Sequence, residues 1–580
     1  MKIKKILVFV AALLGGVLVA LAQWSNNVNE SLLIYEGETN VREIAADTNG
    51  NTWVYWQAPL NDGENTLGVY LQLIDSLGNK VFGEEPLLVS DYPTRTWTTC
   101  NKYLFVDREG NAIVAVHDIR NAVETQYLSY TLYKISPKGE FLWGEDGIGL
   151  EGTQAFPMNS HMTMTQMDDN SYVFAWTAVK GETDIYEVKM QRLSSEGEML
   201  WDIADMTITD PENKVQYTWP TVIDAGKNQV IVVYFKGSNC DIYARKIDFD
   251  GTSVWNEDTR LYRSGWPSSI PAWSLVDVQP SGDGGVLVAW TDDRYMTGLA
   301  TYMTYVKPNG EIGFAAGVDG QKLCYGDYQG SHVTCKYDPY TDTFLALWRE
   351  SYSAYLYRAL AQRLSKDGEL LWGEEGVEIQ PFTNHQYGYF SIQDAPDGQA
   401  AFFYMHNQTT YTNTEACVTL INTADPSLRR DFIYTDTVNV CEKSDLLSTN
   451  LCNNSYWTVL WCDDYVGANP SLRVHRINTD LTVGTRAEGA VDEIRADNTH
   501  FEVLTTLVEG RAMFATNLAE ASQATLAIYD VNGALVDTPF DGVLVAGKQY
   551  IEWNANVPAG IYLATLTTNQ GVETVKILVK

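Results

Sequence analysis

One apolar motif occurs eight times between residues 52 and 461. Each copy is a strand-like run that ends in or near an aromatic residue or histidine, and successive runs end 56 to 61 residues apart: Thr52–Trp56, Ala112–His117, Tyr172–Trp176, Val230–Tyr234, Val286–Trp290, Phe344–Trp348, Ala401–Tyr404 and Trp457–Trp461. Repeated units of this size stack on their neighbours to bury a shared core. The length of the chain therefore reflects repetition of one β unit more than a set of unrelated domains.

A second hairpin follows each run. In six copies its glycine is followed four residues later by a large aromatic residue: Gly78 and Phe82, Gly139 and Trp143, Gly197 and Trp201, Gly251 and Trp255, Gly310 and Phe314, Gly368 and Trp372. We expect the ring to pack one sheet against the next. The seventh and eighth units lack both signals. The pattern of each unit predicts four antiparallel strands, which are typical of a β-propeller blade.

The N-terminal segment is expected to complete the last unit. Eight sets of three strands are separated by only seven segments that can serve as fourth strands, and Ser31–Tyr35 resembles two of those segments, Pro86–Ser90 and Gly376–Gln380. Pairing of this strand with the last unit would leave no long open edge. We therefore predict an all-β fold with an eight-bladed propeller over residues 23–490. A seven-bladed ring and an open solenoid are the alternatives.

Charge limits the partners of the chain. There are 74 acidic and 40 basic residues among 580, which gives a formal net charge of -34. Such a surface repels nucleic-acid phosphates and anionic lipids. We expect no nucleic-acid partner.

The N-terminus is typical of a secretory signal peptide. Lys2, Lys4 and Lys5 precede the apolar run Ile6–Leu21, and Ala20-Leu21-Ala22 supplies small residues for cleavage before Gln23. The apolar run is shorter than the roughly 20 residues that span a bilayer. We assign residues 1–22 to the signal peptide and expect no transmembrane segment in the mature chain.

The C-terminal part predicts a second, smaller domain. Short alternating runs flank Val531-Asn532-Gly533, and Asn-Gly is typical of a β-hairpin with a type I′ turn. We expect a linker at 491–504 and a small immunoglobulin-like β-sandwich over 505–580.

This part of the sequence resembles the type A C-terminal sorting domain of the type IX secretion system of Bacteroidetes. Four segments match in order and end at the last residue: Leu526–Val536, Gly547 with Ile551–Asn554, Pro558–Leu566, and Gly571 with Val575–Lys580. The motif positions that the resemblance marks are Tyr529, Asp530, Asn532, Gly533, Pro558, Gly560, Tyr562, Lys576 and Lys580. The resemblance implies that the type IX machinery carries the protein from the periplasm across the outer membrane, where it is secreted or attached to the cell surface.

Candidate binding residues gather at one end of the predicted ring. Up-and-down topology brings the starts of the first strands and the ends of the second strands to the same face. The residues there are Trp97, His161, Trp219, Trp273, His332 and Tyr389 at the starts of first strands, and Asp292, Asp293 and Arg294 after a second strand. Aromatic and imidazole groups suit sugar rings or peptide side chains, although they could also fill the channel. We favour a non-catalytic protein that binds an extracellular glycan or protein ligand.

The alternative is an enzyme that acts on a polysaccharide. Two carboxylates at a set separation can cleave a glycosidic bond as acid and base, and Asp292, Asp293 and Asp463 are the candidates. Their simpler interpretation is a strand end with an internal salt bridge, so no catalytic residue is assigned.

Metal and cofactor sites are not predicted. Seven His and eight Cys form no zinc motif. The Gly/Trp hairpin locally resembles the repeat of pyrroloquinoline quinone propellers, but the chain has no adjacent Cys-Cys pair and its units are longer, so no cofactor is expected. Export permits disulfides, and two cysteine pairs with equal spacing are possible bridges: Cys324 with Cys335 and Cys441 with Cys452.

Overall fold

The computed structural model describes most of the chain. The described residues are 24–60, 66–94, 103–118, 120, 129–150, 161–179, 185–204, 206–210, 212–238, 240–263, 276–294, 298–324, 326, 328–353, 356–409, 413–435, 443–463, 469–485, 499–503, 507–508, 511–518, 521–531, 533–544, 547–569 and 571–580. They divide into two compact units, Met1–Thr485 and Arg486–Lys580. The predicted signal peptide, Trp97, Trp273, Cys441 and Asn532 lie outside the described residues.

The described part of the first unit contains eight four-stranded antiparallel sheets and no helix. The first four sheets are β2 (Asn40–Ala46), β3 (Thr52–Pro59), β4 (Leu67–Ile74) and β5 (Leu87–Thr94); β6 (Leu104–Val106), β7 (Ala112–Asp118), β8 (Ser129–Ile135) and β9 (Ile148–Gly149); β10 (Met162–Gln166), β11 (Tyr172–Val179), β12 (Tyr186–Leu193) and β13 (Thr207–Ile208); and β14 (Tyr217–Asp224), β15 (Gln229–Lys236), β16 (Asp241–Asp248) and β17 (Thr259–Tyr262).

The other four sheets follow the same plan, except that the last one contains a strand from the beginning of the chain. They are β18 (Asp277–Pro280), β19 (Val286–Asp292), β20 (Ala300–Val306) and β21 (Gln321–Lys322); β22 (Gln329–Asp338), β23 (Thr343–Ser353), β24 (Leu356–Leu364) and β25 (Val377–Thr383); β26 (Gln386–Ala395), β27 (Gln399–Thr409), β28 (Asn413–Asn422) and β29 (Arg429–Ile433); and β30 (Lys443–Ser448), β31 (Tyr456–Asp463), β32 (Ser471–Asn478) and β1 (Leu32–Glu36). The all-β organisation predicted from the sequence is confirmed.

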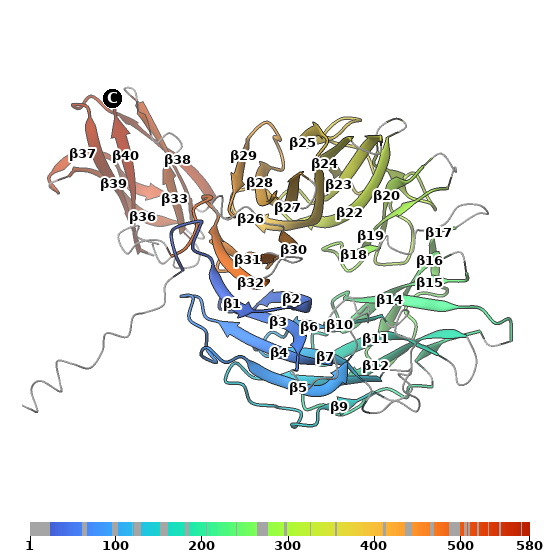
Figure 1. Cartoon of the computed structure of the whole chain (residues 1–580). Coiled ribbons are helices and arrows are strands. Elements are labelled where there is room, and N and C mark those ends of the chain that lie inside the picture. Colours follow the sequence, from blue (N-terminus) through green and yellow to red (C-terminus); the bar gives the residue numbers. More distant parts are fainter. Residues whose placement is uncertain are drawn as a thin grey trace, which may run out of the picture. The chain divides into compact units, whose positions relative to one another are not determined.

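The N-terminal strand closes the series of sheets. β1 pairs antiparallel with β32, with Leu32 opposite Val474 and Leu33 opposite Arg473, which confirms the prediction for this segment. The sheets succeed one another in chain order (Figure 1), and β30 of the eighth sheet lies against β2 of the first. Arg42 on β2 forms an ion pair with Asp445 on β30. The two ends of the series therefore meet through both backbone pairing and side-chain contacts.

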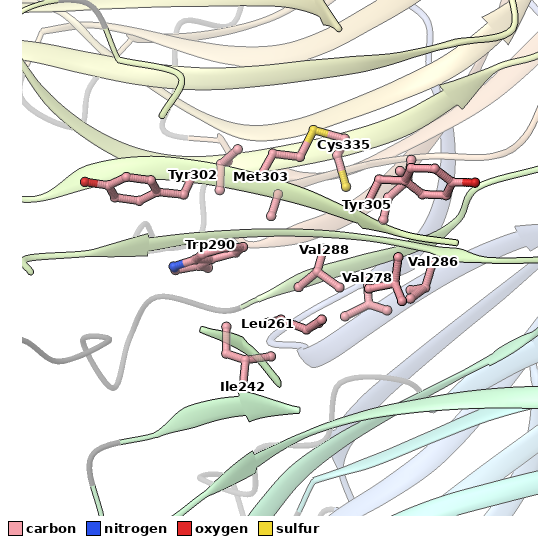
Figure 2. Packing of buried hydrophobic residues seen from close by; sticks show 14 of the residues in the cluster. Ile242, Leu261, Val278, Val286, Val288, Trp290, Tyr302, Met303, Tyr305 and Cys335 are labelled. Carbon is pink, nitrogen blue, oxygen red and sulfur yellow. The ribbon is translucent and has the colours of Figure 1, made fainter. Parts of the chain in front are cut away.

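The second strand of each sheet is the most buried because a neighbouring sheet covers each of its faces. All residues of β7 and β19 are buried, and β3, β11 and β31 are buried over all but their last residue. Figure 2 shows Val286, Val288 and Trp290 of β19 on the side of Leu261 from the preceding sheet, and Met303 of the paired strand β20 beside Cys335 from the next sheet. This double burial explains the eight apolar runs of the sequence.

The recurring aromatic ring of each hairpin contacts the hairpin of the next sheet, as predicted. A Cβ atom placed on Gly310 would lie 2.9 Å from the ring of Trp255, and one on Gly368 would lie 2.8 Å from Phe314. These close approaches require glycine at the hairpin turn, where φ is about 90° for both residues. The Trp255 indole also donates a 3.0 Å hydrogen bond to the carbonyl of Pro308, two residues before that glycine.

Trp24 supplies the ring that the eighth unit lacks. The hairpin of that unit has Leu481 with a φ of 67° at the glycine position and Thr485 four residues later. Trp24 instead packs on Gly78 of the first sheet, and its indole donates a 3.3 Å hydrogen bond to the carbonyl of Ser76, again two residues before the glycine. Trp24 is only 4% exposed. The N-terminal segment thus contributes both the missing strand and the missing ring.

The expected disulfide between Cys324 and Cys335 is not formed, because both residues are free, buried thiols. The Sγ atom of Cys324 lies 2.8 Å from Thr301 Oγ1 on β20 of the fifth sheet, whereas Cys335 belongs to β22 of the sixth sheet. The spacing of Cys324 and Cys335 equals that of Cys441 and Cys452 because the two pairs occupy corresponding places in the repeat. Cys452 is also a free thiol, and Cys441 lies outside the described residues.

The second unit contains two sheets around one core. β33 (Thr499–Val503), β35 (Arg511–Leu518) and β38 (Gly547–Asn554) form one sheet; β34 (Leu507–Val508), β40 (Gly571–Val579), β39 (Gly560–Thr568), β36 (Ser522–Asp530) and β37 (Leu535–Leu544) form the other in that order. Phe514, Ile528, Trp553 and Ile577 belong to the shared core. β33 occupies residues that we expected in a linker, because its Phe501 is buried in this core.

The hairpin expected at Val531–Gly533 is present between β36 and β37, but its loop is not the two-residue type I′ loop. The backbone N–H of Gly533 donates to the carbonyl of Asp530, and the N–H of Asp530 donates to the carbonyl of Ala534. Gly533 has a φ of 80°. This is the three-residue loop in which a turn is followed by a glycine bulge.

The other motif residues of the C-terminal part lie on neighbouring strands. Pro558 accepts a 2.8 Å hydrogen bond from the hydroxyl of Tyr562, and Gly560 begins β39. Lys576 on β40 lies opposite Leu563, and Lys580 is the exposed last residue. Across the described ranges of both units, no helix has the length and apolar character needed to cross a membrane.

We predict that Trp24→Ala lowers the free energy of unfolding of the first unit by about 3 to 5 kcal/mol, because a large buried ring is removed between the first and last sheets. The measurement is urea denaturation followed by tryptophan fluorescence. Leu77→Ala, which removes an exposed side chain of the hairpin that Trp24 contacts, is the matched control and should change stability by less than about 0.5 kcal/mol. Equal midpoints for wild type and Trp24→Ala would contradict the proposed closing role of Trp24.

Candidate functional site

Four first strands share the same irregularity near their beginning. The pairing register shifts after Thr218 in β14, after Ser331 in β22, after Gly388 in β26 and after Ser444 in β30. The next residue in each strand has a left-handed backbone, with φ between 52° and 56°: Trp219, His332, Tyr389 and Asp445. We call these four the rim residues.

The rim residues occupy a conformation that usually belongs to glycine. A bulky residue held there costs about 1 to 3 kcal/mol, and such strain is typical of binding and active sites, where the surrounding structure imposes it. Tyr389 is 44% exposed, His332 is also exposed, and Trp219 is half-buried. The left-handed conformation therefore costs energy at positions that carry aromatic or polar side chains and not glycine.

His161 occupies the same position in the third sheet but is enclosed. It lies six residues before Met167, as Trp219 lies six residues before Ala225, and both of these later residues open matching turns. Its ring stacks on Trp219 with a centroid distance of 5.2 Å. Burial lowers the pKa of His161 to about 3, so the ring is neutral at physiological pH. His161 thus supports Trp219 and does not form an open ligand site.

The structure places three of the predicted residues, Trp219, His332 and Tyr389, at equivalent positions in the fourth, sixth and seventh sheets. Asp445 was missed because its sheet carries no aromatic residue there, although its position in the repeat indicates it.

Arg349, which sequence reasoning also missed, lies beside His332. Its Nε donates a 3.2 Å hydrogen bond to Ser331 Oγ, and that oxygen is 3.0 Å from His332 Nδ1. Its Nη1 donates a 3.3 Å hydrogen bond to the carbonyl of Tyr387 on β26 of the next sheet. Desolvation of the imidazole by the groups packed around it, and secondarily the charge of Arg349, lower the pKa of His332 to about 4, although part of the residue's surface remains exposed. At physiological pH the imidazole is neutral beside a fixed cation.

The acids at the ends of the second strands are held in ion pairs. Asp292 is fully buried; its Oδ2 accepts hydrogen bonds from Trp290 Nε1 at 2.8 Å and from Arg294 Nη2 at 2.6 Å. Arg294 in turn lies over the ring of Tyr302. Asp292 and Arg294, which we expected to contact a ligand, pair with each other, and these contacts match their alternative interpretation as a strand end with an internal salt bridge.

The same arrangement recurs at other strand ends. Asp463 accepts a hydrogen bond from Trp461 Nε1 and pairs with Arg473 at 3.0 Å and Lys443 at 3.4 Å. Asp118 with Arg120 and Glu350 with Arg358 form equivalent pairs, both at 2.7 Å. These carboxylates are engaged by basic side chains of the fold.

Asp293 differs from its neighbour Asp292. It is half-buried, and its Oδ1 atom is buried without a hydrogen-bond partner. It is the one carboxylate of the predicted Asp-Asp-Arg series that no basic side chain engages in the described residues.

A chain of hydrogen bonds joins a glutamate and two histidines in the seventh sheet. Glu415 Oε2 lies 3.3 Å from His406 Nδ1, and His406 Nε2 lies 2.8 Å from His385 Nδ1. Tyr387 stacks on the His406 ring with a centroid distance of 5.0 Å. We call Glu415, His406 and His385 the histidine relay.

The surroundings of His406 shift its pKa. Burial lowers the pKa of His406, Glu415 acts in the opposite direction, and the neighbouring His385 lowers the pKa further. The relay was overlooked because His406 and Glu415 come from two strands and His385 from the connection before β26. Its one sequence signal was His406, which stands in the seventh unit where the fifth unit has Asp292. In the described residues, no group of three or more potential ligands could hold a metal ion.

No protein-family model and no curated protein matches the sequence. Similar solved structures include an endo-arabinase from Bacteroides thetaiotaomicron, with 13% identity and a TM-score of 0.27 over 44% of this chain and 92% of that one. An α-L-arabinanase from Penicillium chrysogenum complexed with arabinobiose has 11% identity and a TM-score of 0.34 over 78% and 98% of the two chains. An acylaminoacyl peptidase from Pyrococcus horikoshii has 8% identity and a TM-score of 0.37 over 76% and 59%.

We do not keep the non-catalytic function that we favoured from the sequence, since the solved structures named above include an endo-arabinase and an α-L-arabinanase. The alternative, an enzyme that acts on a polysaccharide, is taken up below as a proposal. At such low identities and TM-scores, none of the named activities is transferred to this chain.

Proposed function

We propose that the chain is an exported enzyme that acts on a polysaccharide at the face formed by the rim residues and the histidine relay. The observation that carries the proposal is the relay itself. A carboxylate that orients one imidazole, which in turn contacts a second, is an arrangement suited to general acid–base chemistry near neutral pH.

The relay is positioned beside the strained part of its sheet. His385 directly precedes β26, and Tyr389 lies three residues into that strand. With Nδ1 of His385 directed to His406, Nε2 remains for exchange of a proton with a ligand. Tyr389 and His332 offer rings with polar atoms on the adjacent strands, which suits the mixed polar and apolar faces of sugars.

The finer architecture and the export route belong to the same proposal. The eight sheets, the pairing of β1 with β32 and the contact between β30 and β2 support a closed propeller of eight blades. The two-sheet second unit, with its motif residues in hairpins and strands, supports an immunoglobulin-like sorting domain for the type IX machinery. The mature protein would then reach the medium or the outer cell surface through the periplasm.

We expect His385→Gln to reduce turnover by about 10²- to 10⁴-fold, the usual contribution of a positioned acid or base. The assay is release of new chain ends from a panel of polysaccharides of several linkages, arabinan among them. Glu415→Gln should give a smaller loss, because it keeps the shape of the relay but removes the charge. Tyr340→Ala, at an exposed turn of another sheet, is the control and should retain wild-type turnover. Unchanged turnover in His385→Gln would exclude the relay as the catalytic group.

A second prediction separates the two adjacent aspartates. Asp292→Asn should lower the free energy of unfolding by about 3 to 5 kcal/mol, because it leaves the Arg294 guanidinium without its charged partner. Asp293→Asn should leave stability within about 0.5 kcal/mol of wild type. Thermal unfolding followed by circular dichroism measures both. Similar losses in the two variants would show that Asp293 is also engaged in the fold.

Removal of residues 505–580 should prevent passage across the outer membrane and leave the first unit in the periplasm. The test is cell fractionation and immunoblotting in a bacterium that has the type IX system, with the full chain as the control. Equal amounts of truncated and full-length protein outside the cell would contradict the assignment of the sorting domain.

A further inference from the structure

Arg349 differs from the other arginines at the strand ends. Arg120, Arg294, Arg358 and Arg473 each pair with a carboxylate at 2.6 to 3.0 Å. Arg349 forms no ion pair in the described residues, and its hydrogen bonds go to a hydroxyl and a backbone carbonyl. The chain has a formal net charge of -34, so acidic residues are abundant. The Arg349 guanidinium nevertheless pairs with no carboxylate among the described residues.

The position of Arg349 is fixed from both sides. On β23 it lies opposite Ser331 of β22, the residue before the strained His332. Its other hydrogen bond reaches Tyr387 on β26, two residues before the strained Tyr389. The ring of Tyr357 lies 5.0 Å from the guanidinium carbon. The cation is therefore oriented between two rim residues and is not a free surface side chain.

The surroundings of the Arg349 guanidinium suit it to bind an anionic group of a ligand. Burial lowers the pKa of Arg349, which means that the cation has lost part of its hydration without gaining an anion. Nη2 makes no hydrogen bond in the described structure, so its two N–H groups remain for a ligand. The planar fork of a guanidinium matches the two oxygens of a carboxylate or sulfate.

We propose that Arg349 binds the negatively charged group of an acidic sugar, so that the substrate is a polysaccharide containing uronic acid or sulfated residues. That the acidic sugar is a substrate rests on the proposed function, whereas the binding site itself rests on the contacts of Arg349. His332, neutral and exposed beside the cation, offers an uncharged polar contact to the same sugar.

The test measures binding and turnover with three classes of polymer at physiological ionic strength, where long-range repulsion by the acidic chain is screened: polygalacturonate, dextran sulfate and neutral dextran or arabinan. Wild type should bind an acidic polymer, and Arg349→Gln should weaken that binding by about 10- to 100-fold, the value of one charged hydrogen-bonded contact. Arg349→Lys should recover part of the loss, because it keeps the charge without the planar fork. Arg260→Gln removes one exposed charge on β17 and should bind like wild type. Thermal unfolding establishes that each variant is folded.

The outcomes separate the source of the anion and the two proposals. Arg349-dependent binding of polygalacturonate assigns a carboxylate, and Arg349-dependent binding of dextran sulfate alone assigns a sulfate. Arg349-dependent binding without turnover of any polymer supports the site and contradicts the enzyme. Turnover of a neutral polymer that Arg349→Gln leaves unchanged supports the enzyme and overturns the site. The absence of binding to both acidic polymers also overturns the site.

Discussion

The pairing of β1 with β32 is the contact on which the rest of the first unit depends. Without it the eighth sheet has three strands, an exposed edge and no ring to place against the first sheet. With it, Trp24 covers Gly78 and Arg42 pairs with Asp445. Further hydrogen bonds hold the first and eighth sheets together: the Tyr456 hydroxyl donates to the carbonyl of Gly50, and the Thr52 hydroxyl donates to the hydroxyl of Thr458. Sheets that only pack on their neighbours need such a junction between the first and the last of them.

Much of the fold could be predicted from spacing alone. Runs such as Val286–Trp290 are buried on both faces and therefore read as continuous apolar strands, and the turn glycines could be recognised by their interval to the next aromatic residue. The strand supplied by Ser31–Tyr35 followed from counting units. Trp24 could not be found in this way, because it replaces a lost ring from the other end of the chain and has no glycine before it.

The candidate site was less predictable because its chemistry depends on pairing. Asp292 and Arg294 are charged and two residues apart, which is the pattern of a site as well as of a salt bridge. The buried contacts of Asp292 with Trp290 and Arg294 favour the salt bridge. Arg349 follows the same kind of strand but pairs with no acid, since Glu350 is engaged by Arg358. The histidine relay joins His406 and Glu415, which the register of β27 and β28 places opposite each other, with His385 from the connection before β26.

Closure by the N-terminal strand also sets the order of folding. β1 and β32 are separated by more than four hundred residues, so their pairing carries the entropy of closing a very long loop and depends on contacts of high sequence separation, which form slowly. The first strand has no partner until Ser471–Asn478 is present. Whatever the order in which the middle sheets form, the first unit is a chain with two open ends until its last strand has emerged, and it becomes fully folded only in that final step.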